Sequence, residues 1–220
     1  MKYYAIIVAG GSGKRMQHTT AKQFLLLKNK PVLMHTLAAF HDSVYRPELI
    51  VVLPPDLHGQ WQTLCTTYHC QIPHQVVSGG DQRFHSVRNG LMTIKEDGIV
   101  AVHDAVRPLV STRLINAGFE GATLNGNAIP YIIPNDSVRR LKTDDSKIMN
   151  RDSIALIQTP QVFESNQLKT AYQQHYHPRF TDDASVVEEA GFKINLVEGE
   201  RHNLKITYPE DLELAHFLVK

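Results

Sequence analysis

The chain has 220 residues, 42% of them hydrophobic, which is enough to bury a core and argues against wholesale disorder. Its 23 Lys and Arg residues against 22 Asp and Glu residues leave a formal net charge of +1, so no broad basic surface for nucleic acid is expected. No stretch approaches the roughly 20 apolar residues of a membrane span. With two cysteines and no signal-peptide pattern, we expect a cytoplasmic protein that binds neither nucleic acid nor membrane.

Strands and helices alternate through the first 133 residues. In chain order, the predicted elements are strand Tyr3–Val8, helix Pro31–Phe40, strand Leu49–Leu53, helix Leu57–Tyr68, strand Gln75–Val77, helix Phe84–Ile94, strand Ile99–Val102, helix Ser111–Leu124 and strand Ala128–Ile133. Such alternation indicates βαβ units. We therefore expect an α/β fold with a mostly parallel, Rossmann-like sheet and helices on both faces.

The rest of the chain, from residue 134 on, departs from this alternation. Ser137–Leu141 and Lys147–Met149 flank five polar turn-forming residues, which predicts a β-hairpin protruding as an arm at about residues 135–152. A helix near Asp182–Ala190, a strand near Lys193–Val197 and a last helix from Pro209 follow. No repeat or linker interrupts the sequence, so residues 1–220 are expected to form a single domain.

A glycine-rich turn follows the first strand and carries two cations, Lys14 and Arg15. Such a turn exposes backbone N–H groups, and neighbouring cations suit a polyphosphate. Two known phosphate motifs do not fit: a P-loop needs Gly at Val8 and Ser or Thr at Arg15, and a dinucleotide fingerprint needs Gly or Ala at Met16. The alternative is a tight strand-to-helix turn without a ligand.

Two further polar loops follow predicted strands, one from Ser78 to Arg83 and one from His103 to Pro108. Ligands of open α/β sheets bind beyond the carboxyl ends of the strands, so these loops are expected to meet the first one at a single site. Asp104 closes a strand there and is a candidate ligand for Mg²⁺, the usual partner of nucleotide phosphates. The alternative is an ion pair between Asp104 and Arg107.

Six short motifs occur in a fixed order between Tyr4 and about Phe217. They are Gly13-Lys14-Arg15-Met16, Lys22-Gln23-Phe24, Gly79-Gly80-Asp81, His103-Asp104-Ala105-Val106-Arg107-Pro108, Thr159-Pro160-Gln161 and Asn203-Leu204-Lys205-Ile206-Thr207. Together they resemble the polyol-phosphate cytidylyltransferases. Each motif is short, but six in the same order are specific.

The resemblance implies a CTP site and an acceptor site, with Mg²⁺ as cofactor. For CTP it implies Ala9, Gly10, Gly11 and Ser12 in the first loop, Arg15 and Lys22 on the phosphates, Gly80, Asp81 and Ser86 near the base, and Asp104 near the ribose or metal. For the acceptor or reacting phosphate it implies Arg107, Thr181 and Lys205, with Ser137, Arg151 and Thr159 on the arm side. The family usually has Pro at the position of Ala21 and Thr at that of Ser137.

The resemblance also implies a reaction and an assembly. A polyol phosphate attacks the α-phosphorus of CTP and pyrophosphate leaves, so fixed cations are needed rather than a strong base; Arg15, Lys22 and Lys205 fit that need. The sequence around Asp104 and Thr181 favours methylerythritol 4-phosphate as acceptor. Ribitol 5-phosphate and a nucleotide-binding module without turnover are the alternatives. The resemblance further implies a homodimer whose arms cross to the partner subunit.

Overall fold

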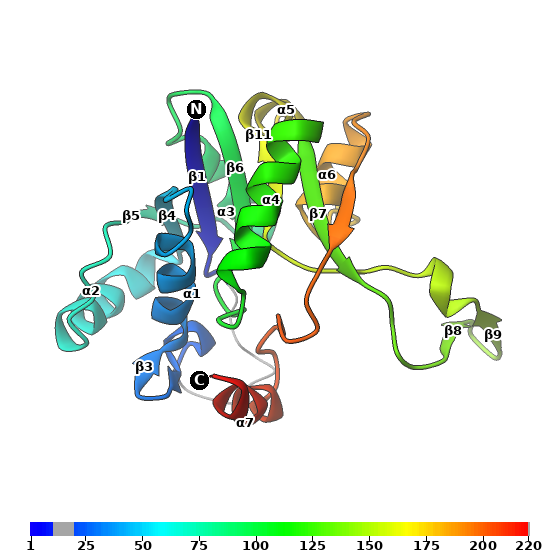
Figure 1. Cartoon of the computed structure of the whole chain (residues 1–220), viewed down its shortest axis with the longest axis horizontal. Helices are drawn as coiled ribbons and strands as arrows, with labels where there is room; N and C mark the ends of the chain where they lie inside the picture. The colour runs from blue at the N-terminus through cyan, green and yellow to red at the C-terminus, as the bar shows by residue number, and fades with distance from the viewer. Residues whose placement is uncertain (11–19, 220) are drawn as a thin grey trace.

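The fold is built on one central sheet (Figure 1), seen in a computed structural model that describes residues 1–10 and 20–219. Within these residues the sheet has eight strands in the order β10-β7-β11-β6-β1-β4-β5, with β12 also paired to β7. The strands are β1 (Lys2–Val8), β4 (Glu48–Leu53), β5 (Gln75–Ser78), β6 (Gly98–Asp104), β7 (Asn127–Ile132), β10 (Leu156–Ile157), β11 (Gln161–Glu164) and β12 (Leu196–Glu198).

The sheet is mostly parallel, which confirms the predicted α/β fold. β1 lies between β4 and β6 and is parallel to both, with Val8 opposite Val52 on one side and Asp104 on the other. β11 was not predicted; it runs antiparallel between β6 and β7, with Gln161 opposite Val102. Its insertion brings a segment far along the chain to the strand that ends in Asp104.

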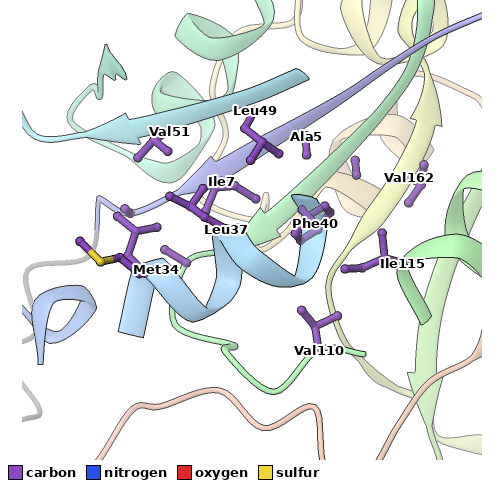
Figure 2. Close-up of a cluster of buried hydrophobic side chains, with 14 of the residues drawn as sticks. Ala5, Ile7, Met34, Leu37, Phe40, Leu49, Val51, Val110, Ile115 and Val162 are labelled. Atoms are coloured by element: carbon purple, nitrogen blue, oxygen red, sulfur yellow. The ribbon is translucent and has the colours of Figure 1, made fainter. Parts of the chain in front are cut away.

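Helices cover both faces of the sheet. One face carries α1 (Val32–His41), α2 (His58–Thr67) and α4 (Thr112–Asn125), and the other carries α3 (Arg83–Leu91), α5 (Ser165–Ala171) and α6 (Asp183–Glu189). Neighbouring residues of a strand point to opposite faces, so Ile7 packs with the first set of helices and Ile6 with the second. Figure 2 shows Ile7 beside Leu37 of α1, with Phe40 further along the same helix and in the same buried cluster.

The predicted arm is a separate two-stranded sheet. β8 (Val138–Leu141) pairs antiparallel with β9 (Ser146–Met149), and Figure 1 shows this hairpin projecting well beyond the central sheet. The arm returns through the short helix η4 (Arg151–Ser153) to β10, where Leu156 lies opposite Ile132 of β7. The root of the arm is therefore tied to the edge of the main sheet.

The C-terminal helix lies below the carboxyl end of β1 (Figure 1). Helix α7 (Pro209–Leu218) begins as predicted at Pro209, and the Asp211 carboxylate accepts the Tyr208 N–H at 2.8 Å. It packs against the small ribbon of β2 (Leu26–Leu27) and β3 (Lys30–Pro31), where Ala215 shares a buried cluster with Leu27. The sequence predicted neither this ribbon nor the short helix η2 (Lys22–Phe24) before it. Another short helix among the described residues is η3 (Pro55–Leu57). Within residues 1–10 and 20–219, no helix combines the length and apolar character needed to cross a membrane.

Candidate active site

Loops at the carboxyl ends of β1, β5 and β6 meet in one pocket, together with η2 and the segment before α7. Its lining among the described residues is Val8, Ala9, Gly10, Lys22, Gln23, Gly80, Asp81, Gln82, Arg83, Ser86, Asp104, Val106 and Lys205. Eight predicted site residues are among them: Ala9, Gly10, Lys22, Gly80, Asp81, Ser86, Asp104 and Lys205. Gly11, Ser12 and Arg15 lie outside the described residues. The convergence predicted from the strand ends is thus present.

Asp104 faces three cations. Lys205 Nζ lies 2.8 Å from Asp104 Oδ2, Arg107 Nε lies 3.6 Å from the same oxygen, and Arg83 Nε lies 3.6 Å from Oδ1. Burial alone raises the pKa of Asp104, but the charges of Arg83, Lys205 and Arg107 outweigh it and hold the pKa well below its ordinary value. The carboxylate therefore stays ionised and organises the cations around the pocket.

Lys22 and Lys205 reach the pocket from different parts of the chain. Lys22, on η2, is buried, and its Nζ donates to the carbonyl of Ile206 at 3.4 Å. Gln23 anchors η2 to the end of β1 by donating to the Ala9 carbonyl at 2.8 Å. Lys205 precedes Ile206, so one stretch of backbone positions both ammonium groups. The result is a local excess of positive charge in a chain that is nearly neutral.

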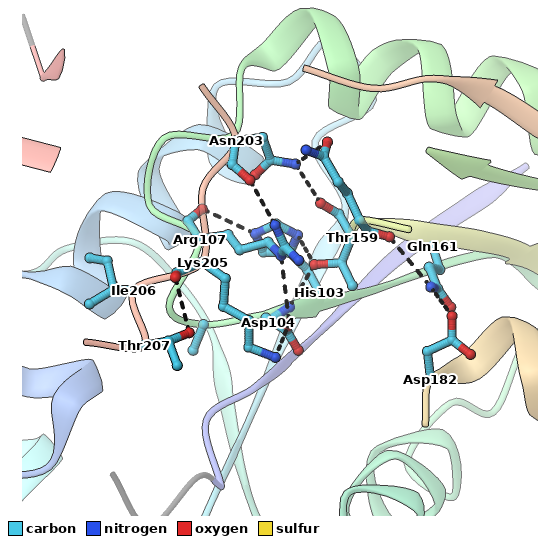
Figure 3. Close-up of polar contacts among 12 residues, drawn as sticks. His103, Asp104, Arg107, Thr159, Gln161, Asp182, Asn203, Lys205, Ile206 and Thr207 are labelled. Carbon is cyan, nitrogen blue, oxygen red and sulfur yellow. Dashed lines mark hydrogen bonds and ion pairs between the residues drawn. The ribbon is translucent and has the colours of Figure 1, made fainter. Parts of the chain in front are cut away.

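A polar network lies behind Asp104 and holds the strand ends together (Figure 3). Thr159 Oγ1 accepts the Asp104 N–H at 3.1 Å and lies 3.0 Å from His103 Nδ1. Arg107 donates to the carbonyl of Asn203 at 2.7 Å, and Asn203 Nδ2 donates to the Thr159 carbonyl at 2.8 Å. Burial lowers the pKa of His103 to about 3, so the ring is neutral at neutral pH.

The second loop is tightly folded around Ser86. Ser86 Oγ accepts the Gly80 N–H at 3.1 Å, and a Cβ built on Gly10 would lie 3.5 Å from the same oxygen, which brings the first and second loops together. A Cβ on Gly80 would lie only 2.5 Å from that of His85. Glycine at position 80 is therefore required for this close approach.

Arg83 and Asp183 form a pair that the sequence analysis missed. Arg83 donates to both oxygens of the fully buried Asp183, at 2.9 and 2.6 Å, and the Tyr172 hydroxyl donates to Oδ1 at 2.6 Å. The other edge of the same guanidinium faces Asp104. The partners are 100 positions apart, so no local pattern could have identified them.

Several residues predicted to bind the acceptor substrate are not among the described residues that line the pocket. Arg107 and Thr159 lie behind Asp104, and Thr181 is exposed just before the N-terminus of α6. Ser137 and Arg151 are exposed on the arm, where Arg151 donates to the carbonyl of Asn135 at 2.7 Å. Within one chain, the arm residues are therefore not assembled with the pocket.

The side chains of the pocket do not make a metal centre of their own. Among the described residues there is no group of three or more His, Cys, Asp or Glu side chains placed to hold a metal. Both oxygens of Asp104 already face cations. A resident metal does not fit this donor set. Magnesium that arrives on a triphosphate needs only one or two carboxylates, and Asp104 remains the candidate predicted from the sequence.

The pocket suits chemistry between two anions. It lies at the carboxyl edge of a parallel sheet, where α/β proteins bind nucleotides, and it presents Lys22 and Lys205 on a rigid frame. Cations fixed in this way stabilise charge that builds up when a phosphate oxygen attacks phosphorus. The fold and the site together define an α/β nucleotidyltransferase.

Comparison with known proteins narrows this class. The model of the 2-C-methyl-D-erythritol 4-phosphate cytidylyltransferase (IspD) family matches residues 3–220. Enzymes of that name from Phocaeicola vulgatus and Porphyromonas gingivalis are each 47% identical to the chain. The first alignment covers 100% of both proteins, and the second covers 99% of this chain and 98% of the relative.

Solved structures agree with the sequence relatives. The crystal structure of the Thermus thermophilus enzyme of the same name matches with a TM-score of 0.81 and 30% identity, over 99% of this chain and 98% of that one. The Francisella tularensis structure matches with a TM-score of 0.82 and 31% identity over 100% of both chains. The chain belongs to the 2-C-methyl-D-erythritol 4-phosphate cytidylyltransferase family.

Proposed function

We propose that the chain transfers CMP from CTP to the phosphate of 2-C-methyl-D-erythritol 4-phosphate and releases pyrophosphate, a step in non-mevalonate isoprenoid synthesis. The observation that carries the proposal is the pocket in which Lys22, Lys205 and Asp104 lie together, in a chain that matches this family over residues 3–220. The whole chain acts as one nucleotidyltransferase domain. Its cytoplasmic location stays a prediction.

The nucleotide is assigned to the first two loops. Backbone N–H groups of the first loop hold the phosphates of CTP, and the second loop holds the base; compact packing around Ser86 supports this division. The residues assigned to CTP are Ala9, Gly10, Gly11, Ser12, Gly80, Asp81, Ser86 and Asp104.

The reaction is assigned to three cations. The acceptor phosphate is an anion near neutral pH, so it attacks the α-phosphorus without needing a strong base. Negative charge then builds on the α-phosphate and on the departing pyrophosphate. Lys22 and Lys205, with Arg15, stabilise that charge; support for the two lysines comes from their position on the pocket wall. Asp104 keeps Lys205 in place through its 2.8 Å contact.

The acceptor site is assigned to residues from two subunits. Arg107 and Thr181 belong to the subunit that holds CTP, and Ser137 and Arg151 reach it on the arm of a homodimer partner. The arm supports this assignment because Leu141 and Ile148 are 82% and 68% exposed on a hairpin that is marginally stable alone. A guanidinium such as that of Arg151 binds a phosphate with two parallel hydrogen bonds.

Magnesium would reach the pocket bound to CTP, where it offsets negative charge on the phosphates. We expect turnover to require Mg²⁺. Pyrophosphate release should stop in excess EDTA and return when Mg²⁺ is added beyond the chelator. Undiminished turnover in excess EDTA would remove the metal from the proposal and leave the protein cations as the only counter-charges.

A substrate panel tests the proposed reaction. CTP is paired in turn with 2-C-methyl-D-erythritol 4-phosphate, ribitol 5-phosphate and a sugar phosphate, and pyrophosphate release is followed. We expect the methylerythritol phosphate to give the highest kcat/KM. A preference for ribitol 5-phosphate would assign the chain to that reaction instead. Binding of CTP without pyrophosphate release from any acceptor would identify a nucleotide-binding module without turnover.

A further inference from the structure

The hydroxyl of Thr159 has two hydrogen-bond neighbours, the Asp104 N–H and His103 Nδ1, and one proton of its own. A threonine hydroxyl donates once and accepts at two lone pairs. The Asp104 N–H can only donate, so Thr159 Oγ1 accepts this hydrogen bond at 3.1 Å. Thr159 Oγ1 and His103 Nδ1 lie 3.0 Å apart, and either of them can be the donor of the hydrogen bond that joins them.

The other ring nitrogen of His103 decides which of the two is the donor. His103 Nε2 lies 3.3 Å from the backbone carbonyl of Arg107, and a carbonyl can only accept. The ring is 0% exposed and packs 5.1 Å from that of Phe40, surroundings in which it carries a single proton. That proton is therefore on Nε2. Nδ1 accepts, and the Thr159 hydroxyl donates to it.

We propose that Thr159 is a positioning residue whose hydroxyl proton is committed to His103, and that the two side chains act as one unit to set the backbone of Asp104. This inference rests on the proposed function but gives Thr159 a role different from the substrate contact that the family resemblance implies. A hydroxyl whose proton points to His103 has no donor left for an anionic phosphate.

The position of Thr159 explains what this unit accomplishes. Thr159 precedes β11, which pairs with β6, the strand that ends in Asp104. Its hydroxyl holds the Asp104 N–H, and its carbonyl accepts from Asn203, which lies two residues before Lys205. Thr159 therefore connects the backbones that carry Asp104 and Lys205, whose side chains meet at 2.8 Å. A small shift at Thr159 would separate that pair.

The direction of the hydrogen bond can be measured without activity. Histidine ring nitrogens are recorded by long-range ¹H–¹⁵N correlation in the full-length protein, and His103 is assigned through backbone-to-ring correlations. We expect a proton on Nε2 and none on Nδ1 between pH 6 and 8. A proton on Nδ1 would overturn the proposal, because the Thr159 hydroxyl would then accept from His103 and keep its own proton for a substrate.

The kinetics of Thr159→Val are the second measurement that tests the proposal. Loss of the hydroxyl should lower kcat by about 3- to 10-fold, roughly the value of one hydrogen bond, while KM for CTP and for the acceptor changes little. Thr159→Ser, which keeps the hydroxyl, should restore kcat. Thr123→Val is the matched control, because its hydroxyl bonds only within α4, to the Phe119 carbonyl at 2.8 Å.

Two outcomes separate this proposal from its rivals. A rise in acceptor KM of about 10-fold with unchanged kcat would show that Thr159 contacts the substrate, and would overturn the positioning role. Failure of the proposed reaction itself would appear differently, as wild-type protein that releases no pyrophosphate from any acceptor. If Thr159→Val does not fold, the tautomer measured on the wild type still decides.

Discussion

Lys22 is held with its ammonium group 3.4 Å from the Ile206 carbonyl, on the wall of the pocket. Because it is assigned to charge that grows during the reaction, Lys22→Ala should lower kcat by about 10²-fold or more and raise KM for CTP much less. Initial rates at varied CTP check this. Lys30→Ala, at an exposed position of β3, is the matched control and should keep wild-type kinetics. Near-normal kcat with weak CTP binding would contradict the assigned role.

His103 should make stability depend on pH. Its pKa is lowered by burial to about 3, whereas in the unfolded chain it takes the ordinary value of 6.5. Above pH 6.5 both states are neutral. Below pH 6.5 the unfolded state binds a proton at this ring, whereas the folded state binds it only near pH 3. The free energy of unfolding therefore decreases as the pH is lowered, by up to about 1.4 kcal/mol per pH unit.

Urea unfolding at pH 7, 6 and 5 measures this slope. His103→Gln lacks the titrating ring, so wild type should lose more unfolding free energy than the variant as pH falls, whatever their difference at pH 7. The other eleven histidines are common to both proteins, so they cancel in the comparison. Parallel pH profiles for the two proteins would show that the pKa of His103 is the same in the folded and the unfolded chain, and would contradict the prediction.

At the scale of elements, one ion pair joins the start of α3 to the start of α6. Asp183 is fully buried, and removing one partner of a buried pair leaves the other charge without compensation. Asp183→Ala should therefore lower the unfolding free energy by about 3–5 kcal/mol. Glu189→Ala at the exposed end of α6, 3.9 Å from Arg179, should change it by less than about 1 kcal/mol. Denaturant titration of both variants measures the contrast, and equal losses would argue against a special role for the pair.

The elements that were predicted share a strong local signal. β1, β4 and β6 are apolar runs, so the parallel sheet could be expected. Glycines follow β1 and β5 directly and mark the ends of these two strands, so the meeting of their loops could be expected as well. β11 has only four residues, Gln161–Glu164, and its antiparallel place depends on pairing with β6. The Arg83–Asp183 pair was missed for a similar reason, since it exists only after two distant helices pack on one face.

At the scale of the whole molecule, the arm decides whether one chain has a complete acceptor site. Arg151 belongs to the arm and is exposed, so in the proposed crossed-arm homodimer it serves the partner's pocket. We expect Arg151→Ala and Lys22→Ala, each nearly inactive, to complement one another after subunit exchange. Every mixed dimer would hold one doubly damaged site and one intact site. Random exchange makes half of the dimers mixed, so about a quarter of wild-type activity should return.

Pyrophosphate release before and after mixing measures the recovery. Exchange is verified separately, by mass spectrometry of differently labelled subunits. Mixing each variant with itself is the control and should restore nothing. If exchange is complete and activity stays absent, Arg151 acts within its own chain and the arm has a structural role only.

Because Leu156 pairs with Ile132, the strands that precede and follow the arm are joined to each other at the edge of the central sheet, and both ends of the arm are fixed there. Residues 133–155 can therefore lengthen, shorten or change in sequence without disturbing the strands that carry the pocket, because the added closure entropy grows slowly with loop length. Selection can act on the length of the arm and on the strands of the pocket separately, while Ser137 and Arg151 stay tied to the acceptor site. Grafting an arm from a relative onto this root should then change the choice of partner subunit while the nucleotide half of the site is inherited intact.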